Sequence, residues 1–457
     1  MGLIADANGD CLHPQQRQPK LGSFPVFKEE IMPAGNPPAT DRFGNPVDPI
    51  VRYARGSILK STDEEVTRML RARHLVGERV RRLGKDSVYD LSGMNRGGGI
   101  TDDDTPHLTS HVPFFERFEG HTEPLALKHM GADPAQHAAL IINRVSAANF
   151  IALTTVLAPG DRVFCYAPAG GVTHPSCVRP ITMAGARFQE FFSFADLEGA
   201  WQAEGAPRLL LITPITASKK HLDFADFRKA LALPRAANTL VYVDDAHMAS
   251  RIGFFEEPRT FEVGDVDLAV CSADKHVAGP RAGVFVGRKD LITTIGSRAY
   301  ELGLEAQAGQ YVGVANALRD FDPTVIKRAG KLAIELVEVL AKQYGSKRAY
   351  LGGPGVSISG DDVLDIARES RGTTEKPALV PVEAAGLVAM EMLEQDGVLT
   401  IGAVSMPGSA PALRLMMYPD GAKLGVERIA ASLENGIARL SEVIDDVDEA
   451  RAQLLGE

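Results

Sequence analysis

The chain has 457 residues, of which 45% are hydrophobic and 24% are charged, and it carries a formal net charge of −10. This length is enough for two domains with a large buried core. The acidic balance argues against a protein that coats nucleic acid or an anionic membrane surface. No apolar run is long enough to span a membrane. We therefore expect a soluble globular protein.

The cysteines and the N-terminus indicate the cellular compartment. Cys11, Cys165, Cys177 and Cys271 form neither a CxxC pair nor a zinc-like spacing, so no metal site is predicted. The first ten residues, MGLIADANGD, lack the basic and apolar regions of a secretory signal. We expect a cytoplasmic protein with free thiols.

The N-terminal part of the chain divides into an irregular segment and a helix, which we group as a region 1–85. Residues 1–58 are rich in Pro, Gly and Asn, which is typical of a disordered tail or of an arm over a partner subunit. A capping-box pattern from Ser61 to Glu64 then predicts a helix start. Further on, three glycines follow Asn95-Arg96 and permit close backbone approach. This loop would either line a substrate site or lie on the surface.

From Ala138 the sequence alternates between apolar strands and helical segments. Such alternation predicts an α/β fold with a mostly parallel sheet covered on both faces. The predicted strands are Arg162 to Tyr166, Leu209 to Thr213, Leu240 to Asp244, Leu268 to Ser272 and Gly283 to Gly287. Because ligands bind at the carboxyl ends of such strands, Thr213, Asp244 and Ser272 are well placed for a site.

The last third of the chain predicts a smaller α+β domain. Asp322-Pro323 supplies a cap and a first-turn proline for a long amphipathic helix that ends at Gly345. A helix near Glu383 to Gln395, a strand near Leu413 to Met417 and a last helix from Val426 follow. We expect a large domain over 86–322 and a small domain over 323–457.

Two adjacent strand ends carry a lysine and an aspartate. Lys275 follows one strand among small residues, where desolvation would free its amine for Schiff-base formation. Ser272 offers a hydroxyl to a phosphate. Asp244 ends the preceding strand, and a buried carboxylate there needs a cationic partner such as a protonated pyridine nitrogen. The alternative for Lys275 is a solvated surface residue, and the alternatives for Asp244 are an N-cap and a structural ion pair. His247 would reach the cofactor's ring hydroxyl or pack in its loop.

Two further features fit an anionic, planar ligand. Ser146-Ala147-Ala148 begins a helix, and small residues there expose backbone N–H groups to an anion. His174, in the segment THPS, would stack on a planar ring or serve as an ordinary loop residue.

The order of these motifs, with THPS, DxAH and SxDKxxxGPxxG, resembles fold-type I pyridoxal phosphate (PLP) enzymes over about residues 90 to 320. The segment from Ser272 to Ile292 is similar to the selenocysteine synthase (SelA-like) family, which includes D-glucosaminate-6-phosphate ammonia lyase. The resemblance implies that Lys275 forms the Schiff base, Asp244 pairs with the pyridine nitrogen and His247 lies near the ring oxygen. It further implies that His174 stacks on the ring and that the phosphate is bound by Ser146, Ala147 and Ser272.

The substrate contacts are expected from Arg414, which occupies the place of a carboxylate-binding arginine in related enzymes, and from Asn95 and Arg96. A structural ion pair is the alternative for Arg414. Ala273 and Ala278 replace glycines that are usual in the family. A reactive cysteine loop and a basic N-terminal domain are not found, which argues against sulfur transfer and against tRNA-linked selenium transfer.

The resemblance implies a PLP-dependent lyase that acts on a small amino acid or amino sugar acid by elimination or by retro-aldol cleavage. The alternatives are a class V-like aminotransferase and a non-catalytic or tRNA-binding relative. A homodimer or a larger homo-oligomer is expected from the same resemblance.

Overall fold

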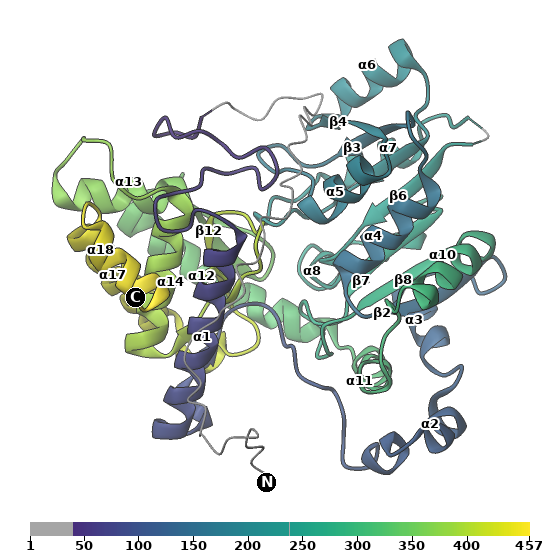
Figure 1. The fold of residues 1–457 in the computed structure, drawn as a ribbon, viewed down its shortest axis with the longest axis horizontal. Coiled ribbons are helices and arrows are strands. Elements are labelled where there is room, and N and C mark those ends of the chain that lie inside the picture. Colours follow the sequence, from purple (N-terminus) through teal and green to yellow (C-terminus); the bar gives the residue numbers. More distant parts are fainter. Residues whose placement is uncertain (1–39, 237) are drawn as a thin grey trace, which may run out of the picture. The chain divides into compact units, whose positions relative to one another are not determined.

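The computed structural model describes residues 40–236 and 238–457, and Figure 1 shows how their helices and strands are arranged. Residues 1–39, which include most of the predicted tail or arm, lie outside the described residues. Their relation to a partner subunit therefore stays a prediction.

A seven-stranded sheet forms the centre of the larger part, with the order β2-β8-β7-β6-β5-β3-β4. The strands β3 to β7 run parallel to one another, whereas β8 is antiparallel to both β7 and β2. Their bounds are β2 His137–Ile142, β3 Arg162–Tyr166, β4 Arg187–Phe191, β5 Leu209–Ile212, β6 Leu240–Asp244, β7 Leu268–Ser272 and β8 Gly283–Arg288. The five predicted strands are confirmed to within one residue, and the predicted α/β class is confirmed.

Alternate residues of the strands face opposite sides of this sheet. In β6, Val241 and Val243 join one buried apolar cluster, whereas Leu240 and Tyr242 join another. Helices cover both faces because each cluster needs cover from water. The helices of this part are α2 His111–Phe118, α3 Thr122–Met130, α4 Val145–Val156, α5 Pro175–Met183, α6 Phe194–Glu204, α7 Phe224–Leu231, α8 Met248–Gly253, α9 Thr260–Val263, α10 Lys289–Glu301 and α11 Ala308–Arg319.

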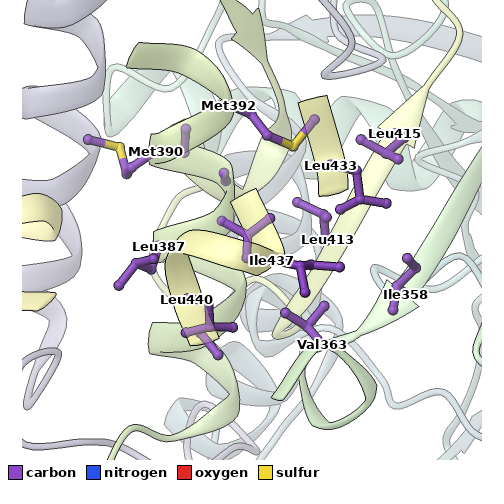
Figure 2. Close-up of a cluster of buried hydrophobic side chains, with 14 of the residues drawn as sticks. Ile358, Val363, Leu387, Met390, Met392, Leu413, Leu415, Leu433, Ile437 and Leu440 are labelled. Carbon is purple, nitrogen blue, oxygen red and sulfur yellow. The ribbon is translucent and has the colours of Figure 1, made fainter. Parts of the chain in front are cut away.

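A second, three-stranded antiparallel sheet with the order β12-β10-β9 belongs to the C-terminal part. Its strands are β9 Ala349–Leu351, β10 Gly355–Ser359 and β12 Ala412–Met416. Side chains of this sheet pack with those of α14 and α17 in a core without water access (Figure 2). The helices here are α12 Pro323–Tyr344, α13 Gly360–Arg371, α14 Pro381–Asp396, α15 Ile401–Val404, α16 Gly421–Leu424, α17 Val426–Val443 and α18 Val447–Leu455.

Helix α12 begins at Asp322-Pro323, where the sequence predicts its start. Asp322 accepts a hydrogen bond from the Thr324 backbone N–H, and Gly345 ends the helix with a φ of 96°. The helix predicted from Val426 is α17, but it stops at Val443 and a separate α18 follows. The boundary between the two predicted domains stays a prediction.

The N-terminal region contributes to the same C-terminal core. Helix α1, Thr62–Leu83, begins with the predicted capping box at Ser61 and Glu64, and the two-residue strands β1 Tyr89–Asp90 and β11 Val398–Leu399 pair in parallel. The segment before α1 differs from the expected tail or partner-covering arm, since Tyr53 and Ile58 are buried in this core. None of the helices in the described residues is long and apolar enough to cross a membrane.

Candidate active site

A cavity of about 480 Å³ lies at the carboxyl ends of β5, β6 and β7, next to the N-termini of α4 and α5. Loops around α15 and the strand β12 of the C-terminal part complete its wall. Nine of the residues singled out in the sequence line it: Arg96, Ser146, His174, Thr213, Asp244, His247, Ser272, Lys275 and Arg414. Thus residues from seven separate segments meet at one site.

Asp244 ends β6 on the side that faces α4 and α5, as the two-residue period of a strand requires. Its Oδ2 atom accepts from Cys177 Sγ at 3.3 Å and from Asn149 Nδ2 at 3.4 Å. Its Oδ1 atom has no hydrogen-bond partner among the described residues, although Asp244 is only 4% exposed. Burial raises the pKa of Asp244, and nearby Lys275 counteracts this rise. A cation at Oδ1 would satisfy the carboxylate.

Asp245, the next residue, has a fully satisfied environment. Arg251 Nε donates to its two oxygens at 3.1 and 3.0 Å, and Thr260 Oγ1 donates to Oδ2 at 2.8 Å. Both members of this ion pair are buried. The pair stabilises the fold and leaves Asp245 no free oxygen for a ligand.

Lys275 follows β7 and is half-buried at the cavity wall. Burial lowers the pKa of its ammonium group against the attraction of Asp274 and Asp244. A lysine with a lowered pKa is a better nucleophile and base at neutral pH. Lys275 is thereby suited to form a covalent bond with an aldehyde or to take up a proton.

The glycine-rich loop reaches the site by backbone pairing. Met94 forms a bridge with Lys275, the Asn95 N–H donates to the Asp274 carbonyl at 2.9 Å, and the His276 N–H donates to the Gly93 carbonyl at 3.1 Å. The first residues of this loop therefore lie against the lysine segment, and Met94 and Arg96 line the cavity.

The side chains of this loop divide between the site and the loop itself. Arg96 lines the cavity with its Nε 3.7 Å from Asp274 Oδ2. The Asn95 side chain instead accepts from the Gly97 N–H at 3.1 Å, and Asn95 is not among the lining residues. The structure therefore brings Arg96 to the site and turns the Asn95 side chain back on its own loop.

The three residues expected at a phosphate differ in their surroundings. Ser146 is exposed in the first turn of α4, at the cavity, as expected for an anion site at a helix N-terminus. The neighbouring Ala147 side chain packs against the apolar cluster beneath α4, so only its backbone can reach a ligand. Ser272 lines the cavity, and its hydroxyl donates to Asp274 Oδ1 at 2.6 Å.

His174 is the N-cap of α5. Its Nδ1 atom accepts from the Ser176 N–H at 3.1 Å and lies 2.8 Å from Ser176 Oγ. Burial lowers the pKa of His174 to about 3, so the ring is neutral near pH 7. A neutral ring fixed at one edge is available for stacking at its face.

Arg414 comes from β12 and enters the cavity from the C-terminal part. Its Nη1 atom donates to the Ala217 carbonyl at 2.6 Å, and its Nε atom has no partner among the described residues. Burial lowers its pKa to about 10. The expected alternative, an ion pair with a carboxylate, is not found among the described residues, so its charge is available to a ligand.

Several residues of the site had no signal in the sequence. Arg144, Arg179 and Arg281 also line the cavity, and Arg281 Nε lies 3.9 Å from Asp274 Oδ2. Lys219 does not line the cavity but contacts His247, with its Nζ 3.0 Å from His247 Nδ1. Each lies outside the recognised motifs or, as Arg281 does in SxDKxxxGPxxG, at a variable position of one.

The seven-stranded sheet with a site at its strand ends, together with the smaller C-terminal part, forms the fold of fold-type I PLP-dependent enzymes. The SepCysS–SepCysE N-terminal domain complex superposes with a TM-score of 0.52 at 12% identity, over 77% of this chain and 95% of that chain. Serine palmitoyltransferase of Sphingomonas wittichii gives 0.51 at 15% identity, over 82% and 84%. Ureidoglycine–glyoxylate aminotransferase of Bacillus subtilis gives 0.51 at 14% identity, over 79% and 96%.

The sequence is also similar to curated proteins over nearly their whole lengths. It is 28% identical to a UPF0425 pyridoxal phosphate-dependent protein of Methanothermobacter thermautotrophicus, over 87% of this chain and 100% of that protein. Proteins of the same name from Methanosphaera stadtmanae and Methanococcus maripaludis are 26% and 27% identical, over 85% and 82% of this chain and 97% and 98% of theirs. No protein-family model matches the chain.

Proposed function

We propose that this protein binds PLP in the cavity and is a PLP-dependent lyase of the SelA-like branch. The observation that carries the proposal is the buried Asp244 carboxylate, whose Oδ1 has no partner among the described residues, together with Lys275 on the same cavity wall. The name of the curated relatives supports the choice of cofactor.

The residues present fit this group. Asp244 Oδ1 would hold the protonated ring nitrogen, because a buried carboxylate needs a cation and the carboxylate in turn keeps that nitrogen charged. His174 would lie against the ring face and His247 near the ring oxygen. Ser146, Ser272 and the first-turn N–H groups of α4 would bind the phosphate, and Arg96, Arg144 and Arg281 supply positive charge nearby.

When bound, PLP supplies an aldehyde that captures an amine and an electron-poor ring that stabilises a negative charge at the substrate carbon. Lys275 would hold the cofactor through its amine. Burial lowers the pKa of this amine, so Lys275 would also serve as the base that takes the proton from the substrate α-carbon.

The substrate class follows from the charges around the cavity. Arg414 presents a guanidinium that pairs with no carboxylate of the described residues, which suits a substrate carboxylate. We therefore infer a small amino acid or amino sugar acid, from which a β-substituent leaves or a carbon–carbon bond is cleaved. A homodimer is proposed as the assembly, and light scattering of the purified protein tests it.

Turnover experiments test the reaction class. The purified protein is incubated with D- and L-amino acids that carry β-hydroxyl or phosphorylated side chains, and the release of keto acid and ammonia is followed. A lyase turns over repeatedly without an added keto acid. A single half-reaction that resumes only when a keto acid is added would replace the lyase proposal by an aminotransferase. Retention of tRNA at low salt would instead favour a tRNA-linked reaction.

A further inference from the structure

A short hairpin before α1 connects the C-terminal part with the large sheet. Val47 and Ala54 form an antiparallel backbone bridge, and the Arg52 N–H donates to the Asp48 carbonyl at 2.8 Å. We call residues 47–54 the N-terminal hairpin. Its buried apolar side chains belong to the core of the C-terminal part. The side chain of Arg52 instead leaves the hairpin toward the large sheet.

Arg52 has a backbone conformation that residues other than glycine rarely adopt, with a φ of 68°. The turn around it is held by Asp48, whose Oδ1 atom accepts from the Ile50 and Val51 N–H groups at 2.7 and 3.2 Å. The second oxygen, Oδ2, accepts from Arg55 Nε at 2.7 Å. Such conformations persist only where the surroundings fix them, and they gather at functional sites. The turn thus gives the Arg52 side chain a fixed direction.

Arg52 forms a buried ion pair with Glu190 of β4. Its Nη1 atom lies 2.7 Å from Glu190 Oε2, and the two side chains are 6% and 2% exposed. The two groups are not aligned for a hydrogen bond, so the contact is mainly one of charge. Cys165, which pairs with Glu190 across β3 and β4, is a neutral thiol because burial raises its pKa. Arg52 is thus the one ion-pair partner of Glu190 in the described part of the chain.

Glu190 in turn holds the segment that carries His174. Its Oε1 atom accepts from the Thr173 N–H at 2.9 Å, and Thr173 is buried. Thr173 directly precedes His174, which is the N-cap of α5 and lines the cavity. A buried carboxylate without a cation is costly, and an ionised acceptor binds an N–H about twice as strongly as a neutral one. Arg52 therefore sets how firmly Glu190 holds this segment.

The next residue of the hairpin holds an adjoining part of the cavity wall. The Tyr53 hydroxyl accepts from the Gly408 N–H at 3.2 Å and donates to Glu65 Oε1 at 2.9 Å. The residues on either side of Gly408 line the cavity. A Cβ at Gly408 would lie 3.5 Å from Pro175 Cγ, so this loop lies against the segment that carries His174. Two consecutive hairpin residues thus hold two adjoining segments of the wall.

We propose that Arg52 is a positioning residue that holds residues 173–175 through Glu190 and so fixes the His174 ring in the cavity. Stacking on a planar ring requires a side chain that is fixed in place, and supporting contacts outside a cavity provide this. The role of His174 toward the cofactor rests on the proposed function. The hold of Arg52 on the segment does not require a cofactor, so the two parts can be tested separately.

Hydrogen exchange of the cofactor-free protein tests the hold on the segment. Arg52→Met leaves Glu190 without its cation, and we expect the Thr173 amide to exchange about 10-fold faster, the difference between a charged and a neutral hydrogen-bond partner. Mass spectrometry with electron-transfer fragmentation assigns the exchange to this amide. Arg52→Lys keeps the charge and should restore most of the protection. Unchanged exchange in Arg52→Met, or an equal increase in all peptides, would overturn the proposal.

Two further variants show whether Arg52 acts through Glu190. Glu190→Gln removes the charge and keeps an oxygen that accepts from Thr173, and it should raise the Thr173 exchange as Arg52→Met does, even if Arg52→Met does not fold. Arg52→Met made in the Glu190→Gln protein should add no further increase. A second increase of equal size would contradict the route through Glu190. The matched control is Arg162→Met, at the opposite end of β3, where Arg162 pairs with Glu204; the Thr173 exchange should not change.

Circular dichroism of the PLP-loaded protein tests the part that concerns His174. Arg52→Met should change the dichroism of the visible cofactor band and weaken PLP binding by up to about 10-fold, the contribution of one stacked aromatic pair. Arg162→Met should change neither. Faster Thr173 exchange with an unchanged band and affinity would contradict the role of Arg52 toward the cofactor. If the unmodified protein takes up no PLP, the proposed function fails, whereas the exchange measurement still decides whether Arg52 holds the segment.

Discussion

The two neighbouring aspartates at the end of β6 lie on opposite faces of the sheet and in opposite environments. Asp245 is buried with Arg251 and Thr260, and every oxygen has a donor. Asp244 faces the cavity with Oδ1 unpartnered among the described residues. The comparison teaches that chemical type and burial do not distinguish a structural carboxylate from a ligand-binding one. Completeness of the hydrogen bonding does.

The largest expected effect is on catalysis. Asp244→Asn keeps the shape of the side chain but removes the charge that balances a cationic ring nitrogen. We expect activity in the keto-acid release assay to fall by about 10²-fold or more, the scale of losing one electrostatic stabiliser. The melting temperature should not fall, because the variant loses a buried, unbalanced charge. Full activity in Asp244→Asn would show that this carboxylate has no part in the reaction.

The largest expected effect on stability comes from the face of the sheet opposite Asp244, where Arg251 pairs with Asp245. Arg251→Met leaves Asp245 and Glu257 buried without their shared cation. Removal of one partner of a buried ion pair costs about 3–5 kcal/mol. Urea denaturation of the folded protein measures this loss, and Asp244→Asn serves as the matched control on the opposite face. Equal denaturation midpoints for Arg251→Met and the unmodified protein would contradict the structural assignment.

A smaller effect is expected from Thr260→Val, which removes one of the donors to Asp245 and preserves the volume of the side chain. A hydrogen bond to a charged group contributes about 1.5–3 kcal/mol. The free energy of unfolding should fall by that amount while activity per folded molecule is unchanged. Loss of activity without loss of stability would mean that Asp245, and not only Asp244, communicates with the site.

The smallest expected effect is a pH dependence. In the cofactor-free protein burial raises the pKa of Asp244 above its ordinary value of 3.8. Between the pKa of Asp244 in the unfolded state and its raised pKa in the folded state, the folded state binds more protons. The stability contributed by Asp244 therefore falls as the pH rises through that window. Asp244→Asn does not titrate there.

We expect cofactor-free Asp244→Asn to melt above the unmodified protein at pH 7, with a gap that narrows as the pH falls toward 3.8. Hydroxylamine treatment and dialysis give the cofactor-free form, and differential scanning fluorimetry across pH values measures the gap. A gap that is constant with pH would indicate that Asp244 is paired by a group of the chain itself.

Much of this site was predictable because its signals are local. Each strand is an apolar run that ends in polar residues, so the end of β6 at Asp244 and the end of β7 before Lys275 were found, and parallel strands bring such ends to one edge. Asp322 and Gly345 mark the ends of α12 by their own cap chemistry.

The remainder depends on packing that a single sequence does not encode locally. The antiparallel course of β8 and the edge strand β4 depend on which strands become neighbours. The position of Lys219 depends on a loop held by Arg414, Tyr350 and Gly352, which are more than 130 residues away in the chain. The Asn95 side chain was assigned to the substrate, but its bond to the Gly97 N–H is set by the geometry of the turn.

The central claim, that Lys275 at this cavity holds PLP, has a direct test. The purified protein is loaded with PLP, reduced with borohydride and digested, and the peptides are mapped by mass spectrometry. The account predicts one phosphopyridoxyl group on the peptide that contains Lys275, and its loss in Lys275→Ala. Modification at Lys219 or Lys220 instead, or a protein that remains unmodified, would contradict it.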